Sequence, residues 1–425
     1  MTYISEPTPL TTGTNSPVAP TPSRGASKSN FKLPFIDGLR GLAALYVALA
    51  HTIGIATIGH HLSARAVLIL SPLQWGPDAV AIFMALSGFC LMWPVVQTEG
   101  AALSGGLPGF FRKRCLRILP AYYAACLVTV AVALLGARHH GSHGGLDVLL
   151  QNARLSKGIL LSHLFLVHDL RPDWIYTIAL PLWSIPVEWH IYFIFALVLL
   201  PLYRRAGIGP AVALSIFVGS GVHFLLPAHY RVDWMHPYML GIFGMGMAAA
   251  VICKAGDGDE GSLLRRVRWP SVFWGMVFVA YILVGWVLHK RTDYAVMQPL
   301  VGFCAMTLIL ACAQLRRYPD NPSRSIRGLL SLLESKWVVG LGAFSYSLYL
   351  IHWVVVSHVN GNVQRLHLPV PIYYAVSITL GLGLAVAGAY VLHITVERPF
   401  LRLKDRGAKS PRVELRPAGM EDVSS

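Results

Sequence analysis

Long apolar runs recur along nearly the whole chain after residue 35. The hydrocarbon core of a bilayer is about 30 Å thick, so a helix needs roughly 20 apolar residues to cross it. A hydrophobic fraction of 55%, a charged fraction of 13% and a mean hydropathy of +0.55 exclude an ordinary soluble domain. We therefore predict an all-α polytopic membrane protein with about ten transmembrane helices in one bundle, at 36–56, 75–96, 117–136, 179–202, 210–226, 235–253, 271–289, 296–315, 336–358 and 372–395.

The two ends of the chain differ in composition from this apolar region. Residues 1–30 contain 11 Ser or Thr and 5 Pro without an apolar run, so 1–34 is predicted to be a disordered cytoplasmic tail. Residues 401–425 are basic and then polar, which predicts a second cytoplasmic tail. The transmembrane domain is then 35–400. Within it, the segment 145–170 is amphipathic and is predicted to be a re-entrant or surface helix.

The net charge of +15 follows the predicted topology and does not indicate a nucleic-acid partner. If the N-terminus lies inside, 25 Lys and Arg residues fall on that side and 9 fall on the other. Cytoplasmic loops carry an excess of Lys and Arg, so this asymmetry predicts that both termini are cytoplasmic. We expect a multi-pass protein of the cell membrane that contacts the lipid bilayer and no nucleic acid.

Arg40 and His51 both fall in the first predicted span. A helix turns about 100° per residue, so eleven residues return a side chain to within about 20° of its starting direction. The rise over that distance is roughly 16 Å, about half of the hydrocarbon core. One helix face would carry a cation near the membrane surface and an imidazole near mid-bilayer. Ionisable groups at such depth indicate function.

Two further blocks place charged residues at the ends of predicted spans. Arg114 and Arg117 would be neighbours on a helix that enters from the cytoplasm. They could hold the phosphates of a nucleotide-bearing donor, or serve only as a positive-inside anchor. Glu188 lies in the first turns of the fourth span, four residues before Tyr192. Its carboxylate could satisfy the helix dipole, bind a sugar hydroxyl or pair with a histidine.

The ninth predicted span carries a polar face with Ser345, Tyr349 and His352. Intramembrane Ser and Tyr often form hydrogen bonds between helices, which is our interpretation of Ser345 and Tyr346. His352 fits a structural role and a functional role equally well. The polar face therefore contributes one histidine, His352, as a candidate functional residue.

The other histidines and the six cysteines give no metal signature. His190 and His393 have no evident partner in the sequence and are interpreted as structural. His139, His140 and His143 resemble a metal-binding tract only weakly, and a solvated loop is the favoured interpretation. The cysteines are scattered without paired spacing, so we predict no metal site.

Together these residues resemble the acyltransferase-3 family of integral-membrane O-acyltransferases. Five blocks match its motifs in order, a closing block at 396–400 also fits, and the resemblance spans about 35–400. We expect no esterase-like domain after the membrane part, as in the standalone members. The five blocks are 36–41 with His51, 83–89, 114–120, Trp183 and Ser184 with Glu188 and Tyr192, and 345–352.

The resemblance implies an acyltransferase that takes an acyl group, acetyl by default, from acyl-CoA. The acceptor would be a hydroxyl of a glycan, a glycolipid or a secondary metabolite. His51 would be the catalytic histidine, as general base or acyl relay, assisted by Glu188 and His352. Arg40, Arg114 and Arg117 would serve the acyl-CoA side. Further residues of these blocks are expected to contact substrate: Asp37, Ser87, Trp183, Tyr192 and Tyr349. Pro186-Val187 before Glu188, and Trp189-His190 after it, depart from the family pattern and are expected to alter the acceptor pocket.

The predicted topology adds an order along the membrane normal. Arg40 and the two other arginines fall toward the cytoplasm, Glu188 and His352 fall toward the outside, and His51 lies between them. This order predicts that the donor enters from the cytoplasm and that the acceptor is reached from the outer half. The rival hypothesis is a multi-pass transporter or permease, in which buried His, Glu and Arg bind substrate or relay protons.

Overall fold

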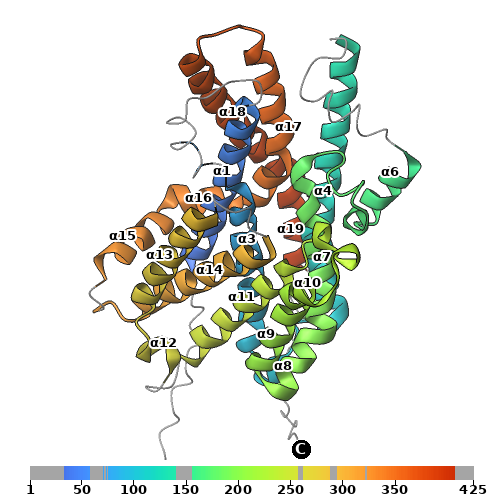
Figure 1. Cartoon of the computed structure of the whole chain (residues 1–425). Helices are drawn as coiled ribbons and strands as arrows, with labels where there is room; N and C mark the ends of the chain where they lie inside the picture. Colours follow the sequence, from blue (N-terminus) through green and yellow to red (C-terminus); the bar gives the residue numbers. More distant parts are fainter. Residues whose placement is uncertain are drawn as a thin grey trace, which may run out of the picture. The chain divides into compact units, whose positions relative to one another are not determined.

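The computed structural model of the protein describes residues 33–57, 70, 73, 75–139, 156–256, 262–287, 294–320 and 323–406. The chain divides into two units, Met1–Lys32 and Leu33–Ser425, and every described residue belongs to the second. The regular elements of the described residues are helices without a strand (Figure 1). This confirms the predicted all-α class. Most of the predicted N-terminal tail, His140 and His143 lie outside the described residues.

The α-helices vary in length from single turns to full membrane spans. They are α1 (Pro34–Thr57), α3 (Gly76–Val96), α4 (Gly106–His139), α6 (Lys157–Leu164), α7 (Ser184–Ile194), α8 (Leu200–Ala206), α9 (Ile208–Ile216), α10 (Val222–Leu225), α11 (Tyr238–Ala255), α12 (Leu263–Arg266), α13 (Trp269–Val287), α14 (Tyr294–Arg317), α15 (Arg324–Leu333), α16 (Lys336–Ala343), α17 (Ser345–Gln364), α18 (Val370–Leu392) and α19 (Arg398–Arg406).

Short 3-10 and π-helical turns connect or continue these helices. The 3-10 turns are η2 (Glu99–Ala101), η3 (His168–Leu170), η4 (Leu180–Trp183), η7 (Ala228–Tyr230) and η8 (Asp233–Met235). The π-helical turns are η5 (Phe195–Leu199), η6 (Phe217–Gly221) and η9 (His393–Glu397).

Among the described residues, seven helices are long and apolar enough to cross a membrane, and they coincide with seven of the ten predicted spans. The predicted spans 210–226 and 271–289 coincide with shorter apolar helices, at Ile208–Gly221 and Trp269–Leu283. The predicted span 336–358 is a bent pair of helices. The protein is therefore an integral, multi-pass membrane protein.

The bend between α16 and α17 is a feature that hydropathy alone does not show. The two helices meet at an angle of 74°, at Phe344. The Ser345 hydroxyl donates a hydrogen bond to the Gly342 carbonyl at 2.9 Å, which satisfies one acceptor left free where α16 ends. The predicted span 336–358 is therefore broken at Phe344 in the structure. Hydropathy does not reveal the break, because the apolar composition continues across it.

Helix α1 packs against α3, α16, α17 and α18. Its approach to α16 depends on Gly342, because a Cβ atom there would lie 2.0 Å from the Asp37 carbonyl oxygen. Gly38 faces α15 in the same way, since a Cβ atom there would lie 2.0 Å from the Leu333 carbonyl oxygen. Small residues let backbones approach closely in membrane helix packing. Gly38 and Gly342 therefore let α1, the helix that carries Arg40, approach α15 and α16 closely.

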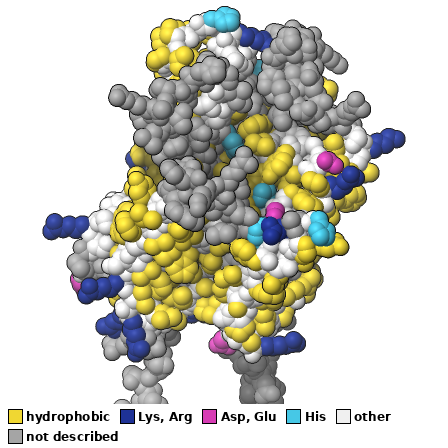
Figure 2. Space-filling view, in the orientation of Figure 1, with side chains coloured by type: hydrophobic (Ala, Val, Ile, Leu, Met, Phe, Trp, Pro, Cys, Tyr) yellow, Lys and Arg dark blue, Asp and Glu magenta, His cyan; other side chains and the backbone are white. Residues whose placement is uncertain are grey.

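The surface of the described residues is largely apolar. Leu127, Phe278 and Leu384 are 71%, 65% and 52% exposed. Figure 2 shows hydrophobic side chains over much of one face, with Lys and Arg mostly at its margins. Exposed apolar surface of this extent is incompatible with water and fits contact with lipid.

The chain between α6 and α7 leads into the interior of the molecule. Exposed apolar residues of α6 give way to buried Pro181 and Leu182 in η4. The Tyr349 hydroxyl donates to the Pro181 carbonyl at 2.8 Å, which ties this segment to α17. Helix α7 therefore begins among other helices, and its first residues are buried.

Candidate active site

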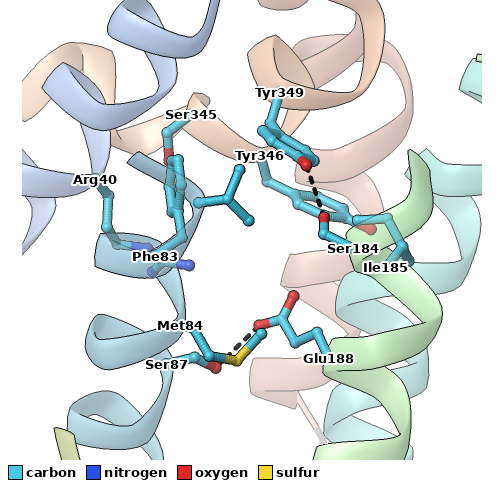
Figure 3. A pocket seen from close by; sticks show the side chains of 11 residues that line it. Arg40, Phe83, Met84, Ser87, Ser184, Ile185, Glu188, Ser345, Tyr346 and Tyr349 are labelled. Carbon is cyan, nitrogen blue, oxygen red and sulfur yellow. Dashed lines mark hydrogen bonds between the residues drawn. The ribbon is translucent and has the colours of Figure 1, made fainter. Parts of the chain in front are cut away.

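A cavity lies among α1, α3, α7 and α17. Four of the residues predicted from sequence line it: Arg40, Ser87, Glu188 and Tyr349. Figure 3 shows their side chains converging from separate helices. The remaining lining residues are Val80, Phe83, Met84, Ser184, Ile185, Ser345 and Tyr346. The cavity thus combines one cation, one carboxylate, several hydroxyls and an apolar wall.

The Glu188 carboxylate is held by two hydroxyl groups. Ser87 on α3 donates to Glu188 Oε1 at 2.9 Å, and Tyr192 on the same helix as Glu188 also donates to Oε1. The Ser87 and Tyr192 hydroxyl oxygens lie 3.2 Å apart. Both donors therefore use one carboxylate oxygen, and the sequence prediction that these three residues belong to one site is consistent with this cluster.

Tyr349 forms the wall of the cavity on the α17 side. Its hydroxyl donates to the Pro181 carbonyl, so the Ser184 hydroxyl, 2.7 Å away, donates to the Tyr349 oxygen. The Tyr349 ring lies 5.9 Å from the Phe83 ring and 5.9 Å from the His352 ring, between centroids. Tyr349 is thus shared by the cavity and the neighbouring histidines.

His51 and His352 form a hydrogen-bonded pair next to the cavity. His51 Nδ1 lies 2.9 Å from His352 Nε2, and His352 Nδ1 lies 3.1 Å from the Leu348 carbonyl. His352 is fully buried, and the Trp353 ring meets His51 edge-on at 5.1 Å between centroids. Neither histidine lines the cavity itself. The structure therefore brings together the two histidines predicted from separate spans.

Arg114 lies behind the Glu188 cluster. Its guanidinium carbon is 5.8 Å from the centroids of both the Phe110 ring and the Tyr192 ring. Its Nε atom is buried without a hydrogen-bond partner among the described residues. A guanidinium held on aromatic faces keeps its donors available for an anion. Arg114 therefore adjoins the cavity through Tyr192 and does not line it.

Three other predicted residues lie apart from the cavity. Asp37 is exposed, and the half-buried Arg117 is absent from the cavity lining. Trp183 stacks on His236, with ring centroids 4.0 Å apart, and is also outside the lining. Asp37 has a packing role, because its backbone carbonyl lies against Gly342 of α16. Its neighbour Arg40 is the residue of that motif that reaches the cavity.

Two residues that were predicted toward opposite sides of the membrane lie together in the structure. Glu188, expected on the outer side, lines the same cavity as Arg40, expected on the cytoplasmic side. His51 therefore does not separate these two residues. The segment η4 carries the start of α7 into the molecule, so Glu188 lies among other helices although its place in the sequence is near the end of a predicted span.

Sequence reasoning missed three polar residues of the cavity. In the sequence, Ser184 belongs only to a motif block, and Ser345 and Tyr346 are expected to form hydrogen bonds between helices. All three line the cavity, although Ser345 and Tyr346 also donate to the Gly342 and Ile118 carbonyls. Their position in the motif blocks was the available signal, since each directly neighbours a predicted residue or lies one turn from it.

Two histidines without a sequence partner do have one in the structure. His393 Nδ1 lies 2.9 Å from the buried Glu397, which also accepts a hydrogen bond from Ser347 at 2.6 Å. His190 Nδ1 lies 3.0 Å from the buried Asp169. Both pairs lie outside the cavity lining. Across the part of the chain that the structure describes, no group of three or more His, Cys, Asp or Glu residues could hold a metal ion.

Comparison with known proteins agrees with these features. The sequence family described as an acyltransferase domain, acyltransferase-3, matches residues 33–394. Acyltransferase MdmB of Streptomyces mycarofaciens is similar, with 25% identity over 398 residues that cover 88% of this chain and 93% of the relative. No solved structure matches the chain. The resemblance seen in the sequence is thereby confirmed, and the chain belongs to the acyltransferase-3 family of membrane acyltransferases.

Proposed function

We propose that the protein is a membrane O-acyltransferase that moves an acyl group, acetyl by default, from cytoplasmic acyl-CoA to a hydroxyl. The acceptor would be a glycan, a glycolipid or a secondary metabolite. The hydrogen bond between His51 and His352, beside a cavity that holds Arg40 and Glu188, carries this proposal. Membership of an acyltransferase family supports it.

The hydrogen bonds of the pair determine which nitrogen can act as a base. A neutral imidazole has one N–H group. His352 uses its Nδ1–H for the Leu348 carbonyl, which leaves Nε2 as the acceptor for His51 Nδ1–H. His51 Nε2 is then the unprotonated nitrogen. His352 thus orients His51 and stabilises the imidazolium that forms when Nε2 takes a proton.

The reaction would proceed by attack of the acceptor oxygen on the thioester carbonyl. His51 Nε2 takes the hydroxyl proton as the C–O bond forms. The C–S bond then breaks, and the leaving thiolate takes the proton from His51, so that the products are an ester and coenzyme A. The surrounding apolar protein would limit competing attack by water.

The arginines would serve the donor. Arg40 projects into the cavity, and Arg114 keeps a buried Nε–H without a partner among the described residues. Guanidinium groups suit phosphate geometry. With both termini in the cytoplasm, as the charge asymmetry predicts, these arginines lie nearer the cytoplasmic side than His51. Arg117 would contribute charge at the entrance.

The direct test begins with the acceptor. Mass spectrometry of surface glycans and metabolites, in cells with and without the protein, should reveal the loss of one acyl increment. Purified protein in detergent should then transfer label from radiolabelled acetyl-CoA to that acceptor. If folded protein instead catalyses uptake into liposomes and transfers no acyl group to the identified acceptor, the transporter hypothesis replaces this one.

A further inference from the structure

Arg40 and Glu188 carry opposite charges in one cavity without pairing. Arg40 comes from α1 and Glu188 from α7, and Figure 3 shows them on opposite sides of the space. No salt bridge among the described residues joins them. A charge in a low-dielectric site is costly unless it has a partner. A ligand that offers an acceptor to one wall and a donor to the other would satisfy both residues.

The two oxygens of Glu188 are not equivalent. Oε1 accepts hydrogen bonds from Ser87 and Tyr192, whereas Oε2 has no hydrogen-bond partner among the described residues. Figure 3 shows this second oxygen directed away from Ser87 and toward the side of Ser184. The carboxylate is therefore oriented by the protein through one oxygen. The other is available to accept a hydrogen bond from a ligand.

The charges on the two walls discriminate among ligand groups. A phosphate would pair with Arg40 but would be repelled by Glu188. A single hydroxyl can accept from Arg40 and donate to Glu188 only where its one oxygen lies within hydrogen-bond distance of both walls. In a trans secondary amide the C=O and N–H bonds lie in one plane and point in opposite directions. The amide can therefore accept a hydrogen bond from a guanidinium on one wall and donate one to a carboxylate on the other.

We propose that Arg40 and Glu188 bind a secondary amide of the flexible arm that carries the thioester in acyl-CoA. This inference rests on the proposed function and specifies which part of the donor the cavity takes. Arg40 donates to the amide oxygen, and Glu188 Oε2 accepts from the amide N–H. The apolar residues Phe83, Met84 and Ile185 flank the methylene groups on either side.

This binding mode leads the arm toward the histidines. Tyr349 lines the cavity, and its ring lies 5.9 Å from the ring of His352. An amide held at the charged walls would leave the thioester end of the arm to extend past Tyr349 toward His51. Glu188 then binds the acyl donor, in place of the role assisting His51 that the family resemblance implies.

The test measures binding of two probes to full-length protein in detergent by isothermal titration calorimetry. The probes are coenzyme A and its adenosine bisphosphate half, which lacks the amides. Glu188→Ala should weaken coenzyme A binding by roughly tenfold or more, since a hydrogen bond to a charged group is lost, and leave the bisphosphate unaffected. Glu188→Gln keeps an acceptor oxygen and should lose less. Glu99→Ala, at an exposed carboxylate of η2, is the matched control and should change neither affinity.

Three results would count against the proposal. Unchanged affinity for coenzyme A in a folded Glu188→Ala protein would exclude the proposed contact between Glu188 and the amide. An equal loss of affinity for both probes would show that Glu188 acts on binding of the nucleotide or on the fold. Size-exclusion chromatography of the Glu188→Gln protein, whose substitution is smaller, distinguishes a folding defect from a binding defect. If the unaltered protein binds neither probe, acyl-CoA is not the donor and the proposed function itself fails.

Discussion

His51 and His352 are 301 residues apart in the chain and share one hydrogen bond. Their other surroundings differ, and this difference gives them different roles. His352 is fully buried and bonds to a backbone carbonyl of its own helix. His51 is only half-buried, and the proposed tautomer would leave its Nε2 as an acceptor. We infer that His352 positions His51, and that His51 is the group that reacts.

Replacement of His352 tests that division of roles. His352→Ala should lower kcat by roughly 10- to 100-fold, a part of the 10²–10⁴-fold that a positioned base contributes, because His51 loses the partner that orients it. The KM for acyl-CoA should change little. His358→Ala, at an exposed histidine of the same helix, is the control. Steady-state kinetics with labelled acyl-CoA would measure both, and a loss confined to KM would argue against a positioning role.

At the scale of helices, α16 supplies a matched pair of glycines. A Cβ atom at Gly342 would lie 2.0 Å from the Asp37 carbonyl, whereas one at Gly340 would have no heavy atom within 4 Å. Gly342→Ala should therefore push α16 from α1 and destabilise the protein by about 1–3 kcal/mol. Gly340→Ala should be neutral or slightly stabilising, since Ala favours helix. Thermal unfolding in detergent measures both, and equal midpoints would contradict the packing argument.

The segment before α7 contains a second pair of histidines, with a different property. The His163 and His168 rings stack with centroids 3.9 Å apart, and Asp169 beside them pairs with His190. Burial, and then the nearby His163, lowers the pKa of His168 to about 3, and burial also lowers the pKa of His163. Both rings are therefore neutral near pH 7 in the folded protein.

The sign of the pH effect follows from these directions. In the unfolded chain each histidine takes a proton below about pH 6.5, while the folded pair resists protonation. The free energy of unfolding should therefore be highest above about pH 6.5. It should fall as the pH drops toward 5, by up to about 2 kcal/mol per histidine. His168→Phe should reduce this slope, and His358→Phe should not. Thermal midpoints from pH 8 to pH 5 measure the effect, and identical slopes for the two variants would refute it.

The helices were predictable because apolar length is a local property of the sequence. The bend at Phe344 was not, since it depends on a backbone break that leaves the apolar composition unchanged. The polar face of Ser345, Tyr349 and His352 was likewise visible from helical spacing. The depth of Glu188 was not visible, because it depends on how η4 packs against Tyr349. Contacts between distant helices, such as that of His51 with His352, were available only through the family resemblance.

At the scale of the whole molecule, the charge asymmetry makes a prediction about orientation. The 25-to-9 split of Lys and Arg predicts that both ends of the chain are cytoplasmic and that the connection between α17 and α18 lies outside. A green fluorescent protein fused after the last residue should fluoresce, whereas alkaline phosphatase there should be inactive. Fusions at His367 should give the reverse pattern. An active phosphatase at the C-terminus would invert the topology and the proposed side of donor entry.

Acyl transfer by His51→Ala shows directly whether His51 is the base of the reaction. The protein and this variant would be purified as monodisperse samples and supplied with radiolabelled acetyl-CoA and the acceptor identified in cells. Loss of the base should lower the rate of ester formation by roughly 10²–10⁴-fold while the variant remains folded. Ester formation at the full rate in His51→Ala would contradict the account.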